Sequence, residues 1–180
     1  MQKRLDVYLS ENNTVKSRSL AASLIKQGSV EVNGRICTKA SFAVDENDNI
    51  RIIGEMPKYV GRGGLKLEKA LSHYRLHLDG SVCIDIGAST GGFTDCMLQN
   101  GAVKVYSVDV GTDQLDEKLR NDPRVVSMEK TDIRNCVGTL PTVDFIGIDV
   151  SFISLKLILP SAYALLKDGG ECVALIKPQF

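Results

Sequence analysis

A glycine-rich loop between a predicted strand and a predicted helix constrains this chain more than any other feature. Residues 85–95 read Asp-Ile-Gly-Ala-Ser-Thr-Gly-Gly-Phe-Thr-Asp and follow a short β-rich run at 81–84. The three glycines let the backbone turn sharply and let a ligand lie against bare main chain. The pattern therefore predicts a strand that ends near residue 85, a tight turn, and a helix that begins near Gly92.

The spacing of the glycines in this loop limits which ligands the loop can bind. No Lys-Ser or Lys-Thr pair follows it, which argues against a phosphate-binding P-loop, and its glycines lack the spacing of the dinucleotide fingerprint. An acidic residue before a Gly-x-x-x-Gly-Gly loop suits S-adenosylmethionine (SAM). The alternative is an ordinary strand-to-helix turn without a ligand. The candidate cofactor-binding residues in this stretch are Asp85, Gly87, Ala88, Ser89, Gly91, Gly92 and Phe93.

Polar residues recur at or just past the ends of the strands predicted after this loop. Those strands cover 104–109, 125–128, 143–149 and 172–177. Ligands of doubly wound α/β sheets bind at the carboxyl ends of the strands. We therefore expect Asp109 to accept hydrogen bonds from ribose hydroxyls and Asp132 to lie near an adenine. The recurrence favours a ligand site over a mere contribution of these acids to solubility.

Two lysines and an aspartate form a second candidate set. Lys177 ends an apolar run and precedes Pro178, so its amine is expected at the rim of the sheet with a partly buried stem. Burial, or a neighbouring cation, lowers the pKa of an amine, which can then act as a base. Asp149, at the end of the adjacent strand, could orient that amine, and Lys66 could approach from the preceding helix. The alternative for Lys177 is a strand-end lysine that extends to water.

Residues 1–53 read as a separate α+β module. Helical spacing of apolar residues predicts a helix from about Arg4, and Ser17 or Ser19 is expected to cap a second helix. The strands expected after these helices cover 30–32, 35–37 and 50–53, with an Asn-Gly turn between the first two.

The segment 54–58 breaks this pattern and is the expected boundary. The predicted domains are 1–56 and 57–180. Residues 14–44 carry a net charge of +4, whereas residues 59–180 carry −2. A basic segment in the N-terminal module beside a slightly acidic larger domain suggests that the module binds a polyanion. A solvated basic face would give the same pattern.

Composition describes a soluble globular protein, with 43% hydrophobic and 24% charged residues. The sequence shows neither a signal peptide nor a membrane span, and its five scattered cysteines suit a reducing cytoplasm. We therefore expect a cytoplasmic protein without a membrane partner. His73 and His77 are spaced as a metal pair on one predicted helix, but no further ligand completes a site, so no metal is predicted.

The N-terminal module carries a family resemblance. The pattern Arg-Leu-Asp, Ser-Arg-Ser and Ile-Lys-Gln-Gly-x-Val-x-Val-Asn-Gly resembles the alpha-L RNA-binding fold, first named for the fourth small-subunit ribosomal protein. The resemblance implies RNA binding by a preformed basic face that contacts phosphates. The residues that it implicates are Arg4, Lys16, Arg18, Lys26 and Arg35.

The larger domain also resembles a family. Its motifs are Tyr-Val-x-Arg-Gly-Gly-x-Lys-Leu, the loop at 85–95, Val-Asp-Val-Gly-x-x-Gln-Leu at 108–115, Asp-Val-Ser-Phe-Ile-Ser at 149–154 and Lys-Pro-Gln-Phe at 177–180. In this order they resemble TlyA-type proteins, often labelled haemolysin A, which are ribosomal RNA 2′-O-methyltransferases of the FtsJ-like class. The resemblance implies SAM as cofactor, ribosomal RNA or ribosomal subunits as partner, and a Lys-Asp-Lys-Glu catalytic set. The first three members fall on Lys66, Asp149 and Lys177.

The glutamate of that set lies on a later strand in the family, beyond Phe180. The expected fold is therefore α/β: a Rossmann-like SAM-dependent methyltransferase domain, incomplete with five of seven strands, preceded by a small α+β RNA-binding domain. A truncated product or a fragment is expected, with poor methyl transfer by the 180-residue form. One alternative is a non-catalytic RNA-binding remnant, and a less favoured one is a membrane-lysing haemolysin, for which no amphipathic basic helix is predicted.

Overall fold

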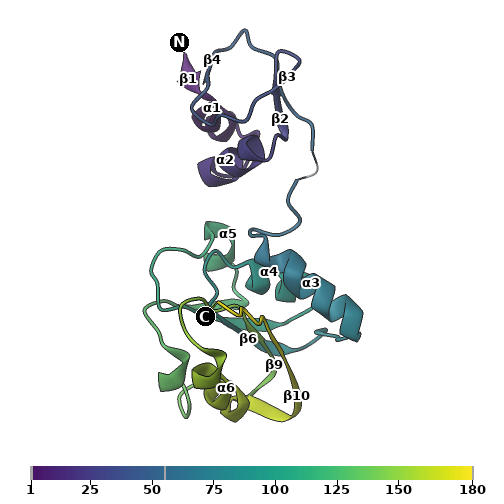
Figure 1. Cartoon of the computed structure of the whole chain (residues 1–180), viewed down its shortest axis with the longest axis vertical. Helices are drawn as coiled ribbons and strands as arrows, with labels where there is room; N and C mark the ends of the chain where they lie inside the picture. The colour runs from purple at the N-terminus through teal and green to yellow at the C-terminus, as the bar shows by residue number, and fades with distance from the viewer. Residues whose placement is uncertain (1, 55, 180) are drawn as a thin grey trace. The chain divides into compact units, whose positions relative to one another are not determined.

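A computed structural model describes residues 2–54 and 56–179 (Figure 1). Contacts between residues divide the chain into two compact units, Met1–Met56 and Pro57–Phe180, which are described separately. Glu55 of the predicted linker and Phe180 of the last motif lie outside the described residues.

The N-terminal unit packs two helices on short antiparallel strands. The helices are α1 (Leu5–Glu11) and α2 (Arg18–Lys26), and Ser17 caps α2 by accepting a hydrogen bond from the Leu20 N–H. Strand β2 (Val30–Val32) pairs with β3 (Arg35–Ile36) in the hairpin that the sequence predicts, and also with β5 (Ile50–Ile52), a pairing that was not predicted. A second pair, β1 (Lys3–Arg4) with β4 (Ala43–Val44), was not predicted, because two-residue strands leave no alternating pattern.

The C-terminal unit is built on a parallel sheet of order β10-β9-β6-β7-β8. The strands are β6 (Val82–Ile86), β7 (Lys104–Val108), β8 (Val125–Met128), β9 (Val143–Ile148) and β10 (Leu166–Ala174). The chain builds outward from β6 to β8 and then crosses to the other side of β6 with β9. The α/β class predicted from the alternating strands and helices is confirmed, and the switch in strand order falls between β6 and β9.

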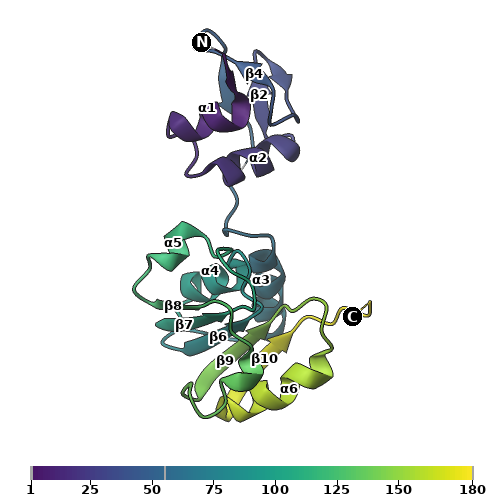
Figure 2. The same ribbon diagram turned by 90° about the vertical axis from the view of Figure 1, so that its left-hand side faces the viewer.

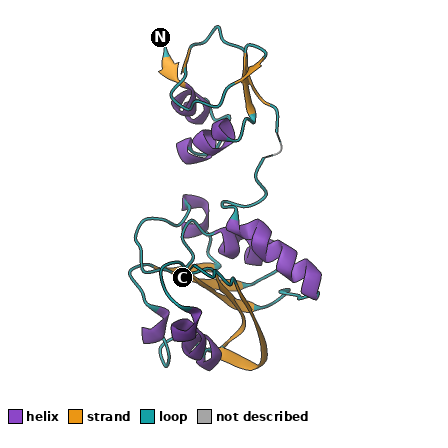
Figure 3. Ribbon diagram, in the orientation of Figure 1, coloured by secondary structure: helices purple, strands orange, loops and turns teal. Residues whose placement is uncertain are grey.

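Helices cover both faces of this sheet (Figures 2 and 3). On one face lie α3 (Gly63–Tyr74), α4 (Gly92–Gln99) and the short α5 (Glu117–Arg120); on the other lie η1 (Ile133–Asn135) and α6 (Leu155–Ala164). Side chains alternate between the faces along each strand. Phe145 packs with Leu67 and Phe93 on the α3 face, whereas Ile146 packs with Ile158 on the α6 face.

The fifth strand lies earlier in the chain than the sequence predicts. The prediction placed it at 172–177, but β10 pairs with β9 from Leu166 and ends at Ala174. Ala174 pairs with Ile148, the last residue of β9, so the partner strand ends there. Lys177 therefore lies three residues beyond β10 rather than at its end.

The predicted histidine pair does not share a helix. Helix α3 ends at Tyr74, and Arg75 adopts a left-handed backbone conformation with φ of 56°, so His77 follows in a different direction from His73. Within residues 2–54 and 56–179, no group of three His, Cys, Asp or Glu side chains is placed to hold a metal ion. None of the helices described is long and apolar enough to cross a bilayer.

Candidate active site

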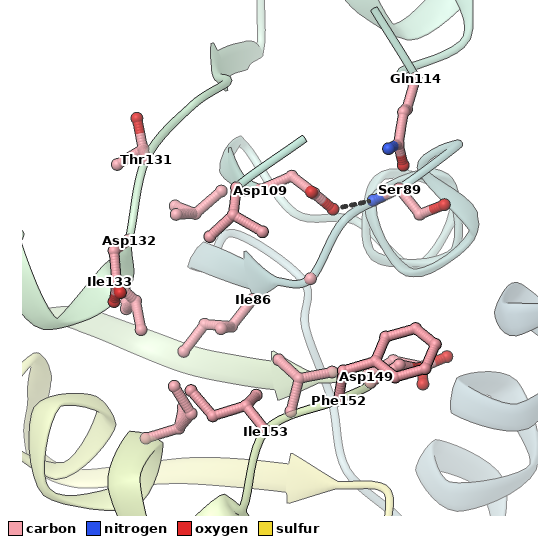
Figure 4. Close-up of a pocket in the computed structure, with 16 residues that line it drawn as sticks. Ile86, Ser89, Asp109, Gln114, Thr131, Asp132, Ile133, Asp149, Phe152 and Ile153 are labelled. Atoms are coloured by element: carbon pink, nitrogen blue, oxygen red, sulfur yellow. Dashed lines mark hydrogen bonds between the residues drawn. The ribbon is translucent and has the colours of Figure 1, made fainter. Parts of the chain in front are cut away.

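A cavity of about 340 Å³ lies at the carboxyl edge of the parallel sheet, where the strand order switches (Figure 4). A volume of this order lies at the lower end of the range for small-molecule sites. The ends of β6 and β7, the segments that follow β6, β7, β8 and β9, and Ile158 of α6 supply its walls. The polar side chains and loop residues that line it include Gly87, Ser89, Asp109, Gln114, Thr131, Asp132, Asp149 and Ser151.

Gly87 is required where β6 turns into the loop. Its φ is 82°, and a Cβ added there would lie 2.7 Å from the Asp149 carbonyl oxygen. Both the backbone conformation and the close approach exclude a side chain. The absence of a side chain brings the main chain of the loop directly against the end of β9, on the wall of the cavity.

Asp109 connects the glycine-rich loop to the end of β7. One carboxylate oxygen accepts from the Ser89 N–H at 2.7 Å, and the other accepts from the Gly111 N–H at 2.7 Å. Because an ionised carboxylate offers about four lone pairs, Asp109 keeps acceptor capacity for a ligand hydroxyl in the cavity that it lines. Figure 4 shows its side chain beside Ser89.

Asp132 lies on the opposite wall, at the start of η1. It accepts from the Arg134 backbone N–H at 2.9 Å, and the Arg134 guanidinium binds both of its carboxylate oxygens. These hydrogen bonds hold the pKa of Asp132 below its usual range. The carboxylate is therefore kept ionised and oriented next to the cavity.

The three residues of the predicted catalytic set meet at Asp149. Lys177 Nζ lies 2.6 Å from Asp149 Oδ1, and Lys66 Nζ lies 3.8 Å from Asp149 Oδ2. Lys177 Nζ also donates to Ser151 Oγ at 2.9 Å. The Lys177 and Asp149 side chains are only 21% and 18% exposed, against 53% for Lys66. The carboxylate thus holds one lysine closely, and a second, more exposed lysine lies nearby.

Glycines before α3 bring Lys66 to this place. A Cβ added at Gly92 would lie 2.9 Å from the Gly64 nitrogen and 3.1 Å from the Gly61 oxygen, so the start of α3 packs directly on the start of α4. Asp95 of α4 fastens the segment before α3 by accepting from the Val60 N–H at 2.9 Å. The glycines of the Arg-Gly-Gly motif therefore let the backbone at the start of α3 pack against the start of α4, and this packing places Lys66 beside Asp149.

Asp85 lies beneath the loop and does not line the cavity. It is fully buried, and its Oδ2 accepts from the Thr94 N–H at 2.9 Å and from the Thr94 hydroxyl at 2.7 Å. Burial raises the pKa of Asp85 to about 7, and the negative charges of Asp149 and Asp109 act in the same direction. Its visible role is to hold the first turn of α4 rather than to contact a ligand in the cavity.

The predicted cofactor-binding residues divide into two groups. Gly87, Ser89, Asp109 and Asp132 line the cavity, whereas Ala88, Gly91, Gly92 and Phe93 do not. The latter shape the loop: a Cβ at Gly91 would collide with Leu119 and Leu115, and Phe93 packs against Gly147 of β9.

Sequence reasoning did not assign a site role to Gln114, Ser151 or Phe152, which also line the cavity. Their only signal was membership of the quoted motifs 108–115 and 149–154. Phe152 has φ of 64° and is 89% exposed at the cavity rim. Positive φ at a bulky residue is a strained conformation that clusters at functional sites.

The predicted RNA-binding residues of the N-terminal unit are all exposed, and two of them share a partner. Asp6, which is buried, accepts from Arg4 Nε and from Arg18 Nε, each at 2.9 Å. The Arg4 hydrogen bond is the largest of the causes that lower the pKa of Asp6 to about 2. Asp6 thus fixes two exposed guanidinium groups side by side. Lys16, Lys26 and Arg35 are exposed elsewhere on the unit.

Family models match both units. A model described as an FtsJ-like methyltransferase matches residues 59–180, and a model of the S4 domain matches residues 3–50.

Individual relatives agree with these matches. The chain is 47% identical to the "Putative rRNA methyltransferase YqxC" of Bacillus subtilis, over 99% of this chain and 65% of that protein. It is 39% identical to the "16S/23S rRNA (cytidine-2'-O)-methyltransferase TlyA" of Mycobacterium tuberculosis, over 98% of this chain and 67% of that protein. A solved structure titled "Putative hemolysin from Streptococcus thermophilus" is 48% identical with a TM-score of 0.71, over 99% of this chain and 67% of that one. The chain therefore spans about two thirds of the length of these relatives.

Replacing Asp85 with asparagine is expected to remove part of the pH dependence of stability. Its pKa rises from 3.8 to about 7 on folding, so the folded protein retains a proton that the unfolded chain releases. The free energy of unfolding of the parent therefore decreases as pH rises from about 4 to about 7, and Asp85→Asn should lose this contribution. Denaturant titrations across this pH range measure it, with the exposed Asp168→Asn as control. Equal pH dependence in Asp85→Asn and the parent would contradict the assignment.

Proposed function

The chain belongs to the FtsJ-like methyltransferase family, and from this premise we propose that it transfers a methyl group from SAM to the 2′-oxygen of a ribose in ribosomal RNA. The observation that carries the proposal is the meeting of Lys66 and Lys177 at Asp149, which lines the cavity. The names of the relatives, which include ribosomal RNA methyltransferases, support the choice of substrate.

The cavity has the features that SAM would need. Asp109 offers acceptor oxygens for the ribose hydroxyls, and Asp132 offers them for the adenine amino group. Gly87 and Ser89 present a bare main chain and its polar groups on the same wall. When bound, SAM supplies an electrophilic methyl carbon next to a positively charged sulfur.

Lys177 is the proposed base. Its amine would take the proton from the 2′-hydroxyl as that oxygen displaces the sulfur from the methyl carbon, and the sulfur would leave as a neutral thioether. Asp149 holds the amine at 2.6 Å, and Lys66, 3.8 Å from the other carboxylate oxygen, is placed to orient the incoming hydroxyl. Much of the rate gain in such a site comes from holding the reacting groups in register.

The meeting of Lys66 and Lys177 at Asp149, which lines the cavity, favours an enzyme over a non-catalytic RNA-binding remnant.

The N-terminal unit is the proposed RNA-binding element. Arg4 and Arg18, fixed by Asp6, offer two oriented guanidinium forks, and a guanidinium fork matches the geometry of a phosphate. Lys16, Lys26 and Arg35 add positive charge. Contacts of this kind position an RNA without reading its sequence. We place this role in domain 1–56 and the chemistry in domain 57–180.

The first test of the proposal is the rate of methyl transfer. In the protein expressed from its natural reading frame, Lys177→Ala should lower tritium transfer from labelled SAM into ribosomal RNA by at least about 10²-fold, because the base is lost. Lys167→Ala removes a lysine that pairs with Asp144 away from the cavity, and it should retain the parent rate. Full activity of Lys177→Ala would remove the proposed base.

A second test concerns SAM. Asp109→Ala should weaken SAM binding by roughly 1–3 kcal/mol in titration calorimetry, because ribose hydrogen bonds lose their acceptor. Asp113, whose side chain is 84% exposed, is the matched control, and Asp113→Ala should bind as the parent does. Parent-like affinity of a folded Asp109→Ala protein would refute the assignment.

A third test concerns the basic residues of the N-terminal unit. The double variant Lys26→Gln, Arg35→Gln should reduce the slope of log affinity against log salt by roughly 1–2, since two phosphate contacts are lost. Lys3→Gln is the control, because Lys3 pairs with Glu11 and is not among the proposed RNA-binding residues. The salt dependence of RNA affinity in this variant should equal that of the parent. An unaltered slope in the double variant would exclude these residues from the RNA interface.

A further inference from the structure

Ser151 contacts the proposed base from a direction that Asp149 does not cover. Lys177 Nζ lies 2.6 Å from Asp149 Oδ1 and donates to Ser151 Oγ at 2.9 Å. Both partners come from the segment that directly follows β9, and both line the cavity. The amine is therefore held between two groups of one short segment.

We propose that Ser151 is a positioning residue for methyl transfer, which fixes the direction of the Lys177 lone pair by accepting a hydrogen bond from the amine. The inference rests on the proposed function, in which Lys177 takes the proton from the ribose hydroxyl. It adds to the Lys-Asp-Lys set a residue that acts only through Lys177.

The number of donors and acceptors supports this role. A neutral amine has two N–H donors and one lone pair, and a carboxylate can only accept. With one N–H on Ser151 Oγ and the ion pair with Asp149 Oδ1 occupying a second side of the amine, the remaining tetrahedral position carries the lone pair. With Asp149 as the only partner, the amine could rotate about that bond and point the lone pair in several directions. A base must have its lone pair within hydrogen-bond reach of the proton that it abstracts.

The segment that carries Ser151 is held at both ends. The Asp149 N–H donates to the Ile86 carbonyl at 3.0 Å, which fixes the start of the segment to β6. Ser154 caps α6 by accepting from the Lys156 N–H, which fixes its end. Phe152 between them has a strained φ of 64°. Side chains that orient reacting groups are effective only when their own backbone is held in this way.

The test compares Ser151→Ala and Ser151→Thr with the parent by steady-state methyl transfer and SAM calorimetry. Ser151→Ala should lower kcat by roughly 10-fold or more, because a misplaced base costs rate rather than binding. Its KM for RNA and its Kd for SAM should stay within about 2-fold of the parent. Ser151→Thr keeps the hydroxyl and should recover kcat to within about 3-fold. Ser72→Ala, the control, removes an exposed serine hydroxyl that does not line the cavity, and it should leave kcat unchanged.

Several outcomes would overturn the inference. Parent-like kcat in Ser151→Ala would show that the hydroxyl does nothing. A loss that Ser151→Thr does not recover, or one accompanied by loss of SAM affinity, would make Ser151 a packing or ligand-binding residue. Full activity in Lys177→Ala would instead refute the proposed base itself, so the two failures are distinguishable.

A second measurement does not depend on turnover. In nitrogen-15 lysine NMR spectra, the Lys177 side-chain signal is assigned by its loss in Lys177→Ala. Ser151→Ala should shift this signal and Ser72→Ala should not, because Ser151 Oγ is the hydroxyl that accepts a hydrogen bond from the amine. An unshifted signal in Ser151→Ala would contradict the contact on which the inference depends.

Discussion

The carboxylate of Asp149 is the interaction on which the rest of the site depends. It binds Lys177 on one oxygen and lies near Lys66 on the other, and these lysines come from opposite ends of the C-terminal unit. The carbonyl of the same residue touches Gly87, where any Cβ would clash. Asp149 therefore connects the lysines to the wall of the cavity. A change of its position would disturb the proposed base and the proposed cofactor wall together.

The topology of the sheet, rather than a local sequence motif, determines the position of Asp149. The strand order switches between β6 and β9, so the segments that follow these two strands turn toward opposite faces and leave a crevice between them. Close glycine contacts then bring α3 onto α4 and carry Lys66 to the crevice. Beneath it, Asp85 and Thr94 form a buried hydrogen-bonded pair that fixes the first turn of α4. The cavity above combines apolar walls with polar side chains such as Asp109, whereas the layer below is buried.

The sequence predicted the acids at the strand ends and the helix that begins at Gly92, because strand and turn signals are local. It could not tell which acid faces the cavity. In the sequence Asp85 and Asp109 each follow an apolar run, yet Asp85 lies inside β6 and is buried beneath the loop, whereas Asp109 directly follows β7 and lines the site. Where each strand ends depends on pairing, and this separates the two cases.

The position of Lys177 was predicted for a partly wrong reason. The apolar run before it resembled the end of a strand, but β10 stops at Ala174, where its partner β9 ends. Strand length is set here by pairing, which the sequence of one strand does not contain. The contact with Ser151 is likewise tertiary, since a serine two residues after a strand-end acid has no distinctive local pattern. The roles of these residues in binding and catalysis remain predictions.

The central claim is that the chain methylates a ribose 2′-oxygen, and the atom that receives the methyl group tests it most directly. Ribosomal RNA from cells that lack the gene would be incubated with the protein and SAM, digested to nucleosides and analysed by mass spectrometry. The account predicts a new nucleoside with the added methyl group on the ribose, absent when Lys177→Ala replaces the parent. A methyl group on a base, or no new nucleoside from an active SAM-binding protein, would contradict it.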